Sequence, residues 1–544
     1  MHVESEQRRR ATRIRRPATG GFVSRSYPAP RSADVIIVGA GHNGLVAAVL
    51  LARRGLSVVV LEEKDMVGGA AKTERPFKKA PGLGVSSGAY LLGLAPPELL
   101  REIGVDLPLK RRDPHYFLPT TDRRYLLFGS NRSEMKRQFL EFFSEQDWNA
   151  NARLQAEIGN LRDDVAPTWL QEPLSIDETA EKFIRKELRS VFVQLCRGTI
   201  TDYLDRFDFK SDLIKAMYAV TDAFSGLSGG FDTPGTGMNF LVHNMCRLPG
   251  ADGTWMIVEG GMGAITSRLA AKAESEGAVI LTGTRVEKIE SQNGAVTGVL
   301  LEDGTSISSK VVVANADPYR TRALVGAGIL SADLSQRLDT MRRDGSTMKV
   351  NLAMKGLPKF TCLSEDKGQY GPTIHLLPDE AVVMDSVRKA HADAMAGKLP
   401  EFPAIEWYFH TPIDPSLRDA EGNHNAALFV QWVPYELSGG KTWADEEAGY
   451  VKHLLSICDR FAPGTSDLVI DTFTLTPKGI EDHFGITRGH IHHIDNGYGF
   501  ADRVPYRFGL GGLYSASAGT HPAGSVIGAA GHNAAQAVLT DLGR

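Results

Sequence analysis

The hydrophobic pattern of residues 34–63 predicts a strand, a helix and a second strand. An apolar run at 34–39 precedes small and apolar residues at 43–54, and a β-branched run follows at 56–61. Two buried strands joined by a helix produce these runs. Because two parallel strands need a crossover connection of this kind, the segment predicts a βαβ unit.

The rest of the chain alternates between two patterns. Residues 110–250 are mixed and helical, whereas 256–313 return to short elements, with a helix at 264–276 and strands near 279–281, 285–289 and 296–302. After another mixed region to about 495, the tail ends in a helix of small residues. This order predicts an α/β fold in which an α+β substrate domain is inserted into a discontinuous, Rossmann-type nucleotide-binding domain. We expect the nucleotide-binding domain at 34–110, 251–325 and 501–544, and the substrate domain at 111–250 and 326–500.

Composition excludes several classes of protein. The 544 residues carry a net charge of −4, which gives no reason to expect nucleic acid or an anionic surface as a partner. No window reaches the ~18 apolar residues of a spanning helix, so we expect no transmembrane segment. The four cysteines, Cys196, Cys246, Cys362 and Cys458, form no C-x-x-C pair. A redox dithiol of neighbouring cysteines is therefore excluded.

Residues 1–33 differ from the rest. They contain eight arginines with serine, threonine and proline, and no acidic residue lies between Glu6 and Asp34. This composition is typical of an organellar transit peptide, although the prolines interrupt any long amphipathic helix; a disordered basic arm is the alternative. In a eukaryotic cell we expect an organelle, the mitochondrial matrix rather than a plastid, with room for a protein partner there. In a bacterium we expect the cytoplasm.

Three glycines between the first strand and its helix form a G-x-G-x-x-G motif. Gly39 fits the tight turn, Gly41 the close approach of backbone to a pyrophosphate, and Gly44 the packing of helix on strand. The helix N-terminus then favours the phosphates. Glu62 follows the second strand, 23 residues after Gly39, where an acid accepts hydrogen bonds from a ribose diol. These residues predict a dinucleotide site.

Two glycine pairs decide between NAD and FAD. Gly68 and Gly69 follow Glu62 and permit a second backbone approach to the cofactor. A separate NAD(P)H domain would need another fingerprint, and the best candidate, VEGGMGAIT, has Thr266 where the third glycine belongs. We therefore predict one tightly held FAD and no NAD(P)H domain.

The segments GAGHNGLVAA, VEGGMGAITSRLA, GVLLEDGTSISSKVVVANADPYRT and GLYSASAGTHPAGSVIGAAGHNAA together resemble the phytoene-desaturase-like flavoproteins. Within that group, TPGTGM, PYELSGGKTW and LTPKGIEDHFGI resemble the family of pyridine nucleotide-disulfide oxidoreductase domain-containing protein 2. Despite that name, we expect no disulfide reductase activity, because the dithiol is lacking. The resemblance implies an FAD-dependent oxidoreductase whose cofactor is held by Gly39, Ala40, Gly41, Asn43, Gly44, Glu62, Glu63, Lys64, Gly68, Gly69, Val286, Gly519, Gly524 and Val526.

The chain departs from this family pattern at three places. Ser517 stands where relatives commonly have glycine, and the family's HPGGG is HPAGS here, with Ala523 and Ser525. His493 matches a family histidine, but the DQ pair that normally follows it is absent. Recognition of the family's substrate is thereby put in question.

We expect a hydride to pass from an apolar substrate, of isoprenoid or lipid-like character, to the flavin. The electron acceptor is oxygen, a quinone or a protein. A positioned base would assist, and His521 is the first candidate and His493 the second; alternatively, His521 only fixes the turn before the last helix. The histidines of GHIHH lack carboxylate neighbours, so no metal site is expected. We expect His42 to lie against the FAD phosphates.

Four aromatic residues, Tyr90, Trp255, Tyr435 and Trp443, are candidates for the wall of a substrate cavity. Two other functions share these motifs. One is a polyene isomerase or saturase that uses reduced FAD. The other is an organellar flavoprotein with a regulatory or scaffold role and little catalysis.

Overall fold

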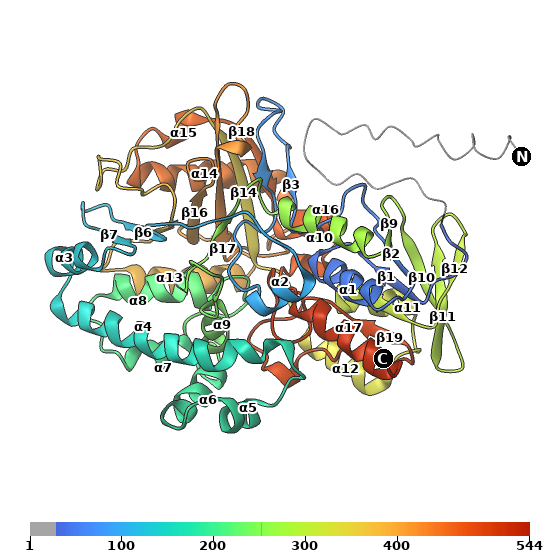
Figure 1. The fold of residues 1–544 in the computed structure, drawn as a ribbon. Helices are drawn as coiled ribbons and strands as arrows, with labels where there is room; N and C mark the ends of the chain where they lie inside the picture. Colours follow the sequence, from blue (N-terminus) through green and yellow to red (C-terminus); the bar gives the residue numbers. More distant parts are fainter. Residues whose placement is uncertain (1–28, 252) are drawn as a thin grey trace, which may run out of the picture.

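The structure is a computed structural model that describes residues 29–251 and 253–544. Residues 1–28 of the predicted basic arm lie outside the described residues. One half of the molecule is built on a parallel sheet (Figure 1). Its strands, in spatial order, are β19 (Leu513–Ser515), β13 (Val312–Ala314), β1 (Val35–Val38), β2 (Val58–Leu61) and β9 (Val279–Leu281). Three distant parts of the chain thus contribute to one sheet.

Both faces of the parallel sheet are buried. Ile37 and Val60 point to a core shared with helices, and their neighbours Ile36 and Val59 point to the opposite core, since successive side chains of a strand alternate. The helical face is covered by α1 (His42–Arg53), α10 (Gly263–Ser275), α17 (Ala529–Asp541) and, beside α1, α2 (Pro97–Ile103). The other face is covered by β10 (Val286–Gln292), β11 (Ala295–Leu301) and β12 (Ser306–Ser308), with α11 (Pro318–Val325) and α12 (Ala332–Met341).

A mixed, seven-stranded sheet organises the other half. Its order is β18 (Val469–Leu475), β14 (Thr347–Met354), β17 (His424–Gln431), β16 (Ala404–Phe409), β15 (Thr373–Leu376), β6 (Tyr116–Pro119) and β7 (Tyr125–Phe128). Val350, Ile405 and Leu428 on one face pack against α14 (Trp443–Phe461). Alternate positions on the opposite face include Lys349 and Glu406, and this face borders the site described below.

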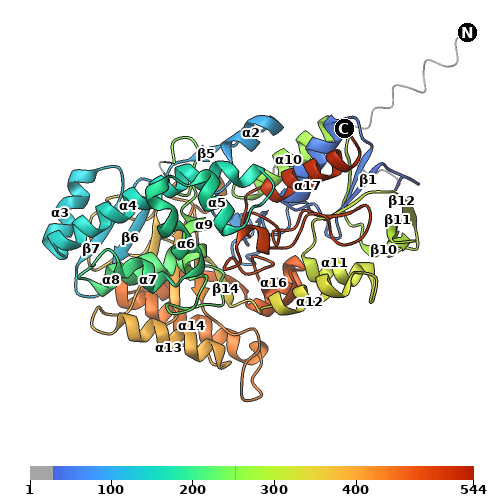
Figure 2. The ribbon, with the colours of Figure 1, turned by 90° about the horizontal axis from the view of Figure 1, so that it is seen from below.

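A layer of helices packs below the mixed sheet (Figures 1 and 2). It comprises α3 (Arg132–Phe142), α4 (Glu145–Val165), α5 (Ile176–Phe183), α6 (Arg189–Arg197), α7 (Ile200–Asp205), α8 (Asp212–Tyr218), α9 (Thr236–His243) and α13 (Val383–Met395). A π-helical turn, Ala219–Ala223, continues α8. Shorter elements are β3 (Thr73–Glu74), β4 (Val85–Ser86), β5 (Leu109–Lys110), β8 (Ile257–Val258), α15 (Thr465–Leu468) and α16 (Pro477–Phe484). Short 3₁₀ turns span Ala166–Leu170, Lys186–Leu188, Pro415–Leu417, Thr487–Gly489 and Phe500–Asp502.

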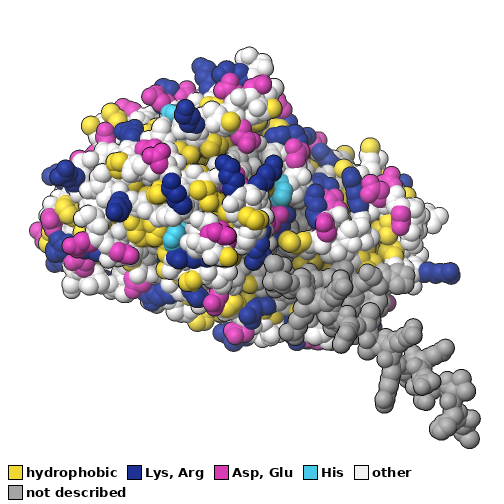
Figure 3. Space-filling model, turned by 90° about the horizontal axis from the view of Figure 1, so that it is seen from above, with side chains coloured by type: hydrophobic (Ala, Val, Ile, Leu, Met, Phe, Trp, Pro, Cys, Tyr) yellow, Lys and Arg dark blue, Asp and Glu magenta, His cyan; other side chains and the backbone are white. Residues whose placement is uncertain are grey.

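The α/β fold class expected from the sequence is confirmed, and the domain boundaries stay a prediction. Among the described residues, no helix combines the length and apolar character that crossing a bilayer requires. Acidic and basic side chains lie interspersed on the face shown in Figure 3.

Candidate functional site

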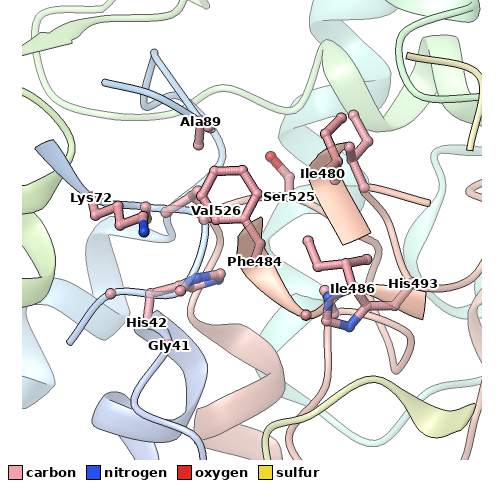
Figure 4. A pocket seen from close by; sticks show the side chains of 18 of the residues that line it. Gly41, His42, Lys72, Ala89, Ile480, Phe484, Ile486, His493, Ser525 and Val526 are labelled. Carbon is pink, nitrogen blue, oxygen red and sulfur yellow. The ribbon is translucent and has the colours of Figure 1, made fainter. Parts of the chain in front are cut away.

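One cavity connects the two halves of the molecule. It runs from the glycine turn before α1 to the polar face of the seven-stranded sheet, and its volume is about 330 Å³. In Figure 4, Gly41 and His42 lie on one side of it, and Phe484, Ile486 and His493 lie opposite. Residues at the end of the parallel sheet and residues of the substrate region therefore line a common space.

The glycine motif forms an open cradle at this cavity. Gly39 has φ +98°, and a Cβ on Gly44 would lie 2.4 Å from the Gly39 carbonyl oxygen, so the helix can approach the turn only at glycine. Gly41 and Gly69 lie back to back, because a Cβ on Gly69 would be 3.6 Å from the Gly41 Cα. The Gly68 amide donates to the Ala40 carbonyl at 2.9 Å, which ties the second glycine pair to the first.

Glu62 closes one end of the cradle. Its carboxylate accepts hydrogen bonds from the Ala40 amide at 2.8 Å and from the Lys64 amide at 3.0 Å, and its side chain lines the cavity. Burial raises the pKa of Glu62, and the two backbone donors oppose that shift. The acid is thus fixed by backbone at the edge of the space where a ribose would lie.

The remaining predicted cofactor residues divide into two groups. Glu63, Lys64, Gly68, Val286 and Val526 line the cavity. By contrast, Gly519 and Gly524 are buried behind its wall; a Cβ on Gly524 would lie 2.4 Å from the His492 Cβ. Ala518 and Ser525, beside these two glycines, provide the wall there.

Two unsatisfied polar atoms lie beside the cradle, a histidine ring nitrogen and an amide oxygen that can only accept a hydrogen bond. Asn43 Oδ1 and His42 Nε2 are buried without a hydrogen-bond partner, and both residues line the cavity. A buried polar atom without a partner costs free energy unless a ligand or water satisfies it. Together with the glycine cradle and the fixed acid, these atoms fit FAD, which would be held between Glu62 and the start of α1.

The structure separates the two candidate catalytic histidines. His493 lines the cavity, and its Nδ1 lies 3.1 Å from the Ser517 hydroxyl, so the serine that departs from the family pattern fixes this ring. Burial lowers the pKa of His493 to about 4. His521 is not among the cavity residues; its ring meets Phe500 edge-on, and neither ring nitrogen has a hydrogen-bond partner. The position of His521 gives no support to a catalytic role.

The aromatic candidates also divide. Tyr90 and Trp255 line the inner cavity with Tyr408 and Phe429, and the Tyr90 and Tyr408 ring centroids are 4.4 Å apart. Tyr435 does not line the cavity and donates to Glu481. The Trp443 indole donates to the Pro434 and Tyr435 carbonyls.

Sequence reasoning missed the charged residues of the inner end. Lys349 on β14 donates to the Ser86 and Gly88 carbonyls, and burial lowers its pKa well below the usual range. Glu406 on β16 accepts from the Tyr408 hydroxyl, and burial raises its pKa to about 8. Both are opposite Phe429 of β17 in the strand register, so they share one row across the sheet. A charged residue inside an otherwise apolar strand is the signal that was available.

Comparison with known proteins decides the family. The sequence pattern of the flavin containing amine oxidoreductases matches residues 44–354. Pyridine nucleotide-disulfide oxidoreductase domain-containing protein 2 of Rattus norvegicus is 32% identical over 554 residues, covering 94% of each chain. The chain therefore belongs to the family of flavin containing amine oxidoreductases.

More distant relatives agree with that placement. Phytoene desaturase (neurosporene-forming) of Rhodobacter capsulatus is 24% identical and covers 90% of each chain. The solved structure of wild-type putrescine oxidase with bound putrescine shares the fold, with a TM-score of 0.59 at 16% identity, over 94% of this chain and 99% of that one. The expectations of an oxidoreductase and of FAD as its cofactor are confirmed.

Proposed function

We propose that this flavin oxidoreductase oxidises a largely apolar substrate bound at the inner end of the cavity, with hydride transfer to FAD. The observation that carries the proposal is the continuity of the cavity from the glycine cradle to a wall of Tyr90, Trp255, Tyr408 and Phe429. Apolar walls with a few polar groups are typical of sites for small organic ligands. The relative named as a phytoene desaturase supports an apolar substrate.

FAD supplies the electron-accepting chemistry when it is bound. The chain's own residues would orient it: Gly39, Gly41, Gly68 and Gly69 leave room for the pyrophosphate, and Glu62 would accept from the ribose diol. His42 Nε2 would donate to a phosphate oxygen of the same ligand, and Asn43 Oδ1 would accept from one of its hydroxyl groups. Val286 would border the adenine, and Val526 and His493 the part of the cofactor nearer the substrate.

The test begins with an absorbance spectrum of the purified protein and identification of the released flavin. The FAD-loaded protein is then mixed without oxygen with phytoene, a long-chain fatty alcohol or putrescine, and bleaching of the flavin bands is followed. Reduction by an apolar compound supports the proposal. Reduction by putrescine alone overturns the apolar substrate.

Two alternatives give different results in the same experiment. A saturase or isomerase would convert a polyene only after its flavin had been reduced, and a scaffold protein would bind FAD weakly and bleach with no compound. The intact cradle around Gly41 and Glu62 favours the oxidoreductase, because a scaffold needs no cofactor site.

We also propose that residues 1–33 direct the protein to an organelle, on the basis of their arginine-rich composition alone. Fusion of this segment to a fluorescent reporter in animal cells tests the proposal. Mitochondrial fluorescence supports it, and diffuse fluorescence overturns it.

A further inference from the structure

Asp222 stands out among the polar residues of the inner cavity because of its backbone. It lies in the π-helical turn Ala219–Ala223 that continues α8, and Thr221, Asp222 and Ser225 all line the cavity. Turns of this type are rare in proteins, but those that occur frequently lie at functional sites, since the extra residue reorients side chains. The turn thus brings a carboxyl group into the space that the substrate would occupy.

The Asp222 carboxyl is only partly satisfied by the protein. Asn244 Nδ2 donates to its Oδ2 at 3.1 Å. Among the described residues, no hydrogen bond is made to Oδ1, and no basic side chain lies within 4 Å of the carboxyl. The neighbouring His243 bonds the Asp222 main-chain carbonyl, at 2.9 Å, rather than the side chain. One carboxyl oxygen is therefore left for a ligand.

The titratable groups around Asp222 provide no positive charge. They come from several packed elements and are Tyr218, Tyr116, Glu406, His243 and Cys246. Burial raises the pKa of both tyrosines and of the Cys246 thiol, and it lowers the pKa of His243 to about 4. At neutral pH the tyrosines, the thiol and His243 are uncharged, and Glu406, with a pKa of about 8, is mostly protonated.

The buried cation Arg112 acts on Glu406 and not on Asp222. The Arg112 guanidinium donates to the Trp255 carbonyl and to Thr373 Oγ1, both at 2.9 Å, and its charge acts on Glu406. Burial without a counter-charge raises the pKa of Asp222 to about 7. A base of this pKa is half ionised at neutral pH, the range in which proton transfer by a carboxylate is most effective.

We propose that Asp222 accepts the substrate proton during oxidation. This inference rests on the proposed function. Oxidation breaks two bonds to hydrogen: a hydride passes with its electron pair to the flavin, which is thereby reduced, and a proton leaves the adjacent atom for Oδ1 of Asp222. The electron pair of that second bond forms the new double bond.

A first experiment follows protonation without any substrate. Infrared spectra of the FAD-loaded protein are recorded from pH 5 to 9 for the wild type, Asp222→Asn, Glu406→Gln and the exposed control Asp303→Asn. We expect a protonated-carboxyl band that is lost around pH 7 in the wild type and in Asp303→Asn, and that is missing in Asp222→Asn. Glu406→Gln removes only the step at higher pH. If Asp222→Asn retains the band that titrates near pH 7, the inference is wrong.

A second experiment measures flavin reduction by whichever compound bleaches the wild type. Asp222→Asn should slow reduction by about 10²–10⁴-fold with little change in KM. The wild-type rate should rise with pH through about 7, because only the ionised carboxylate accepts a proton. If Asp222→Asn raises KM alone, Asp222 anchors a cationic group of the substrate. If Asp222→Asn reduces flavin as the wild type does, Asp222 has no role. Either result overturns the inference and leaves the proposed function intact. If no compound bleaches the wild type, the proposed function fails, and this role of Asp222 with it.

Discussion

Gly41 is the position at which an added side chain would most directly reduce the space for the cofactor. A Cβ there would lie 2.6 Å from Asn315 Nδ2, and Gly41 lines the cavity. We expect Gly41→Val to purify without flavin, because overpacking of this kind costs about 1–3 kcal/mol, roughly 5- to 150-fold in affinity, before the lost phosphate contact is counted.

The control for Gly41→Val is Gly449→Val on α14. A Cβ at Gly449 meets no atom within 4 Å, so this variant should bind FAD as the wild type does. Flavin absorbance per chain after gel filtration measures both. A yellow Gly41→Val protein would contradict the assignment of the cradle.

Single residues also show what the sequence could and could not reveal. Gly39, Gly41 and Glu62 were recognisable because a fixed spacing between strand and helix specifies their positions. Asp222 was not, since no local pattern states where a helix takes a π-turn. Glu406 stood out only as a charged residue inside an apolar strand, because no local pattern states which face of a doubly buried strand borders a cavity. His521 is near the cofactor segments in sequence, but it is not among the cavity residues, and its catalytic role stays a prediction.

At the scale of elements, the strand pattern was informative because both faces of the parallel sheet are apolar. The expected strands near 35–38, 58–61 and 279–281 are neighbours in it. The substrate region was described only as mixed and helical. Strand β6 pairs with β15 across more than 250 residues, and pairing at that distance leaves no trace in local periodicity.

Helix α16 offers a prediction at this scale. It contributes Ile480, His483 and Phe484 to the cavity, and Glu74 on β3 holds it through a 2.9 Å bond with His483 Nε2. Burial alone would raise the pKa of Glu74, but hydrogen bonds from His483 and Ser87 bring it to about 2. Glu74→Gln should therefore loosen α16, with a loss of about 1.5 kcal/mol and roughly tenfold faster amide exchange.

Hydrogen exchange by mass spectrometry resolves this effect along the chain. Peptides from α16 should exchange faster in Glu74→Gln, and peptides from α14 should be unchanged. The control is Glu302→Gln, which also removes one acidic group, from a side chain that is 69% exposed. It should change the exchange of neither helix. Equal exchange of α16 in the wild type and Glu74→Gln would show that the Glu74–His483 contact does not restrain it.

The whole molecule buries an unusual number of neutral histidines, and these set its response to acid. Burial lowers the pKa of eight of them to about 3 or 4, namely His42, His115, His243, His375, His410, His492, His493 and His521. In the unfolded chain each would take up a proton near pH 6.5. Between pH 4 and 6.5 the unfolded state therefore binds more protons at these sites, so stability rises with pH.

Two buried carboxyls act in the opposite direction. Asp222 and Glu406 keep their protons to about pH 7 and 8 when folded, whereas the unfolded chain loses them near pH 4. They reduce the slope below pH 6.5 without reversing it, since eight histidines outnumber them. Above pH 7 they favour a slight decline, which the lowered pKa of Lys349 opposes. With each net proton worth about 1.4 kcal/mol per pH unit, thermal unfolding at fixed FAD concentration should show Tm rising steeply from pH 4.5 to 6.5 and then levelling off or falling. A Tm that stays constant over the acidic range would mean that these histidines are not neutral in the folded protein.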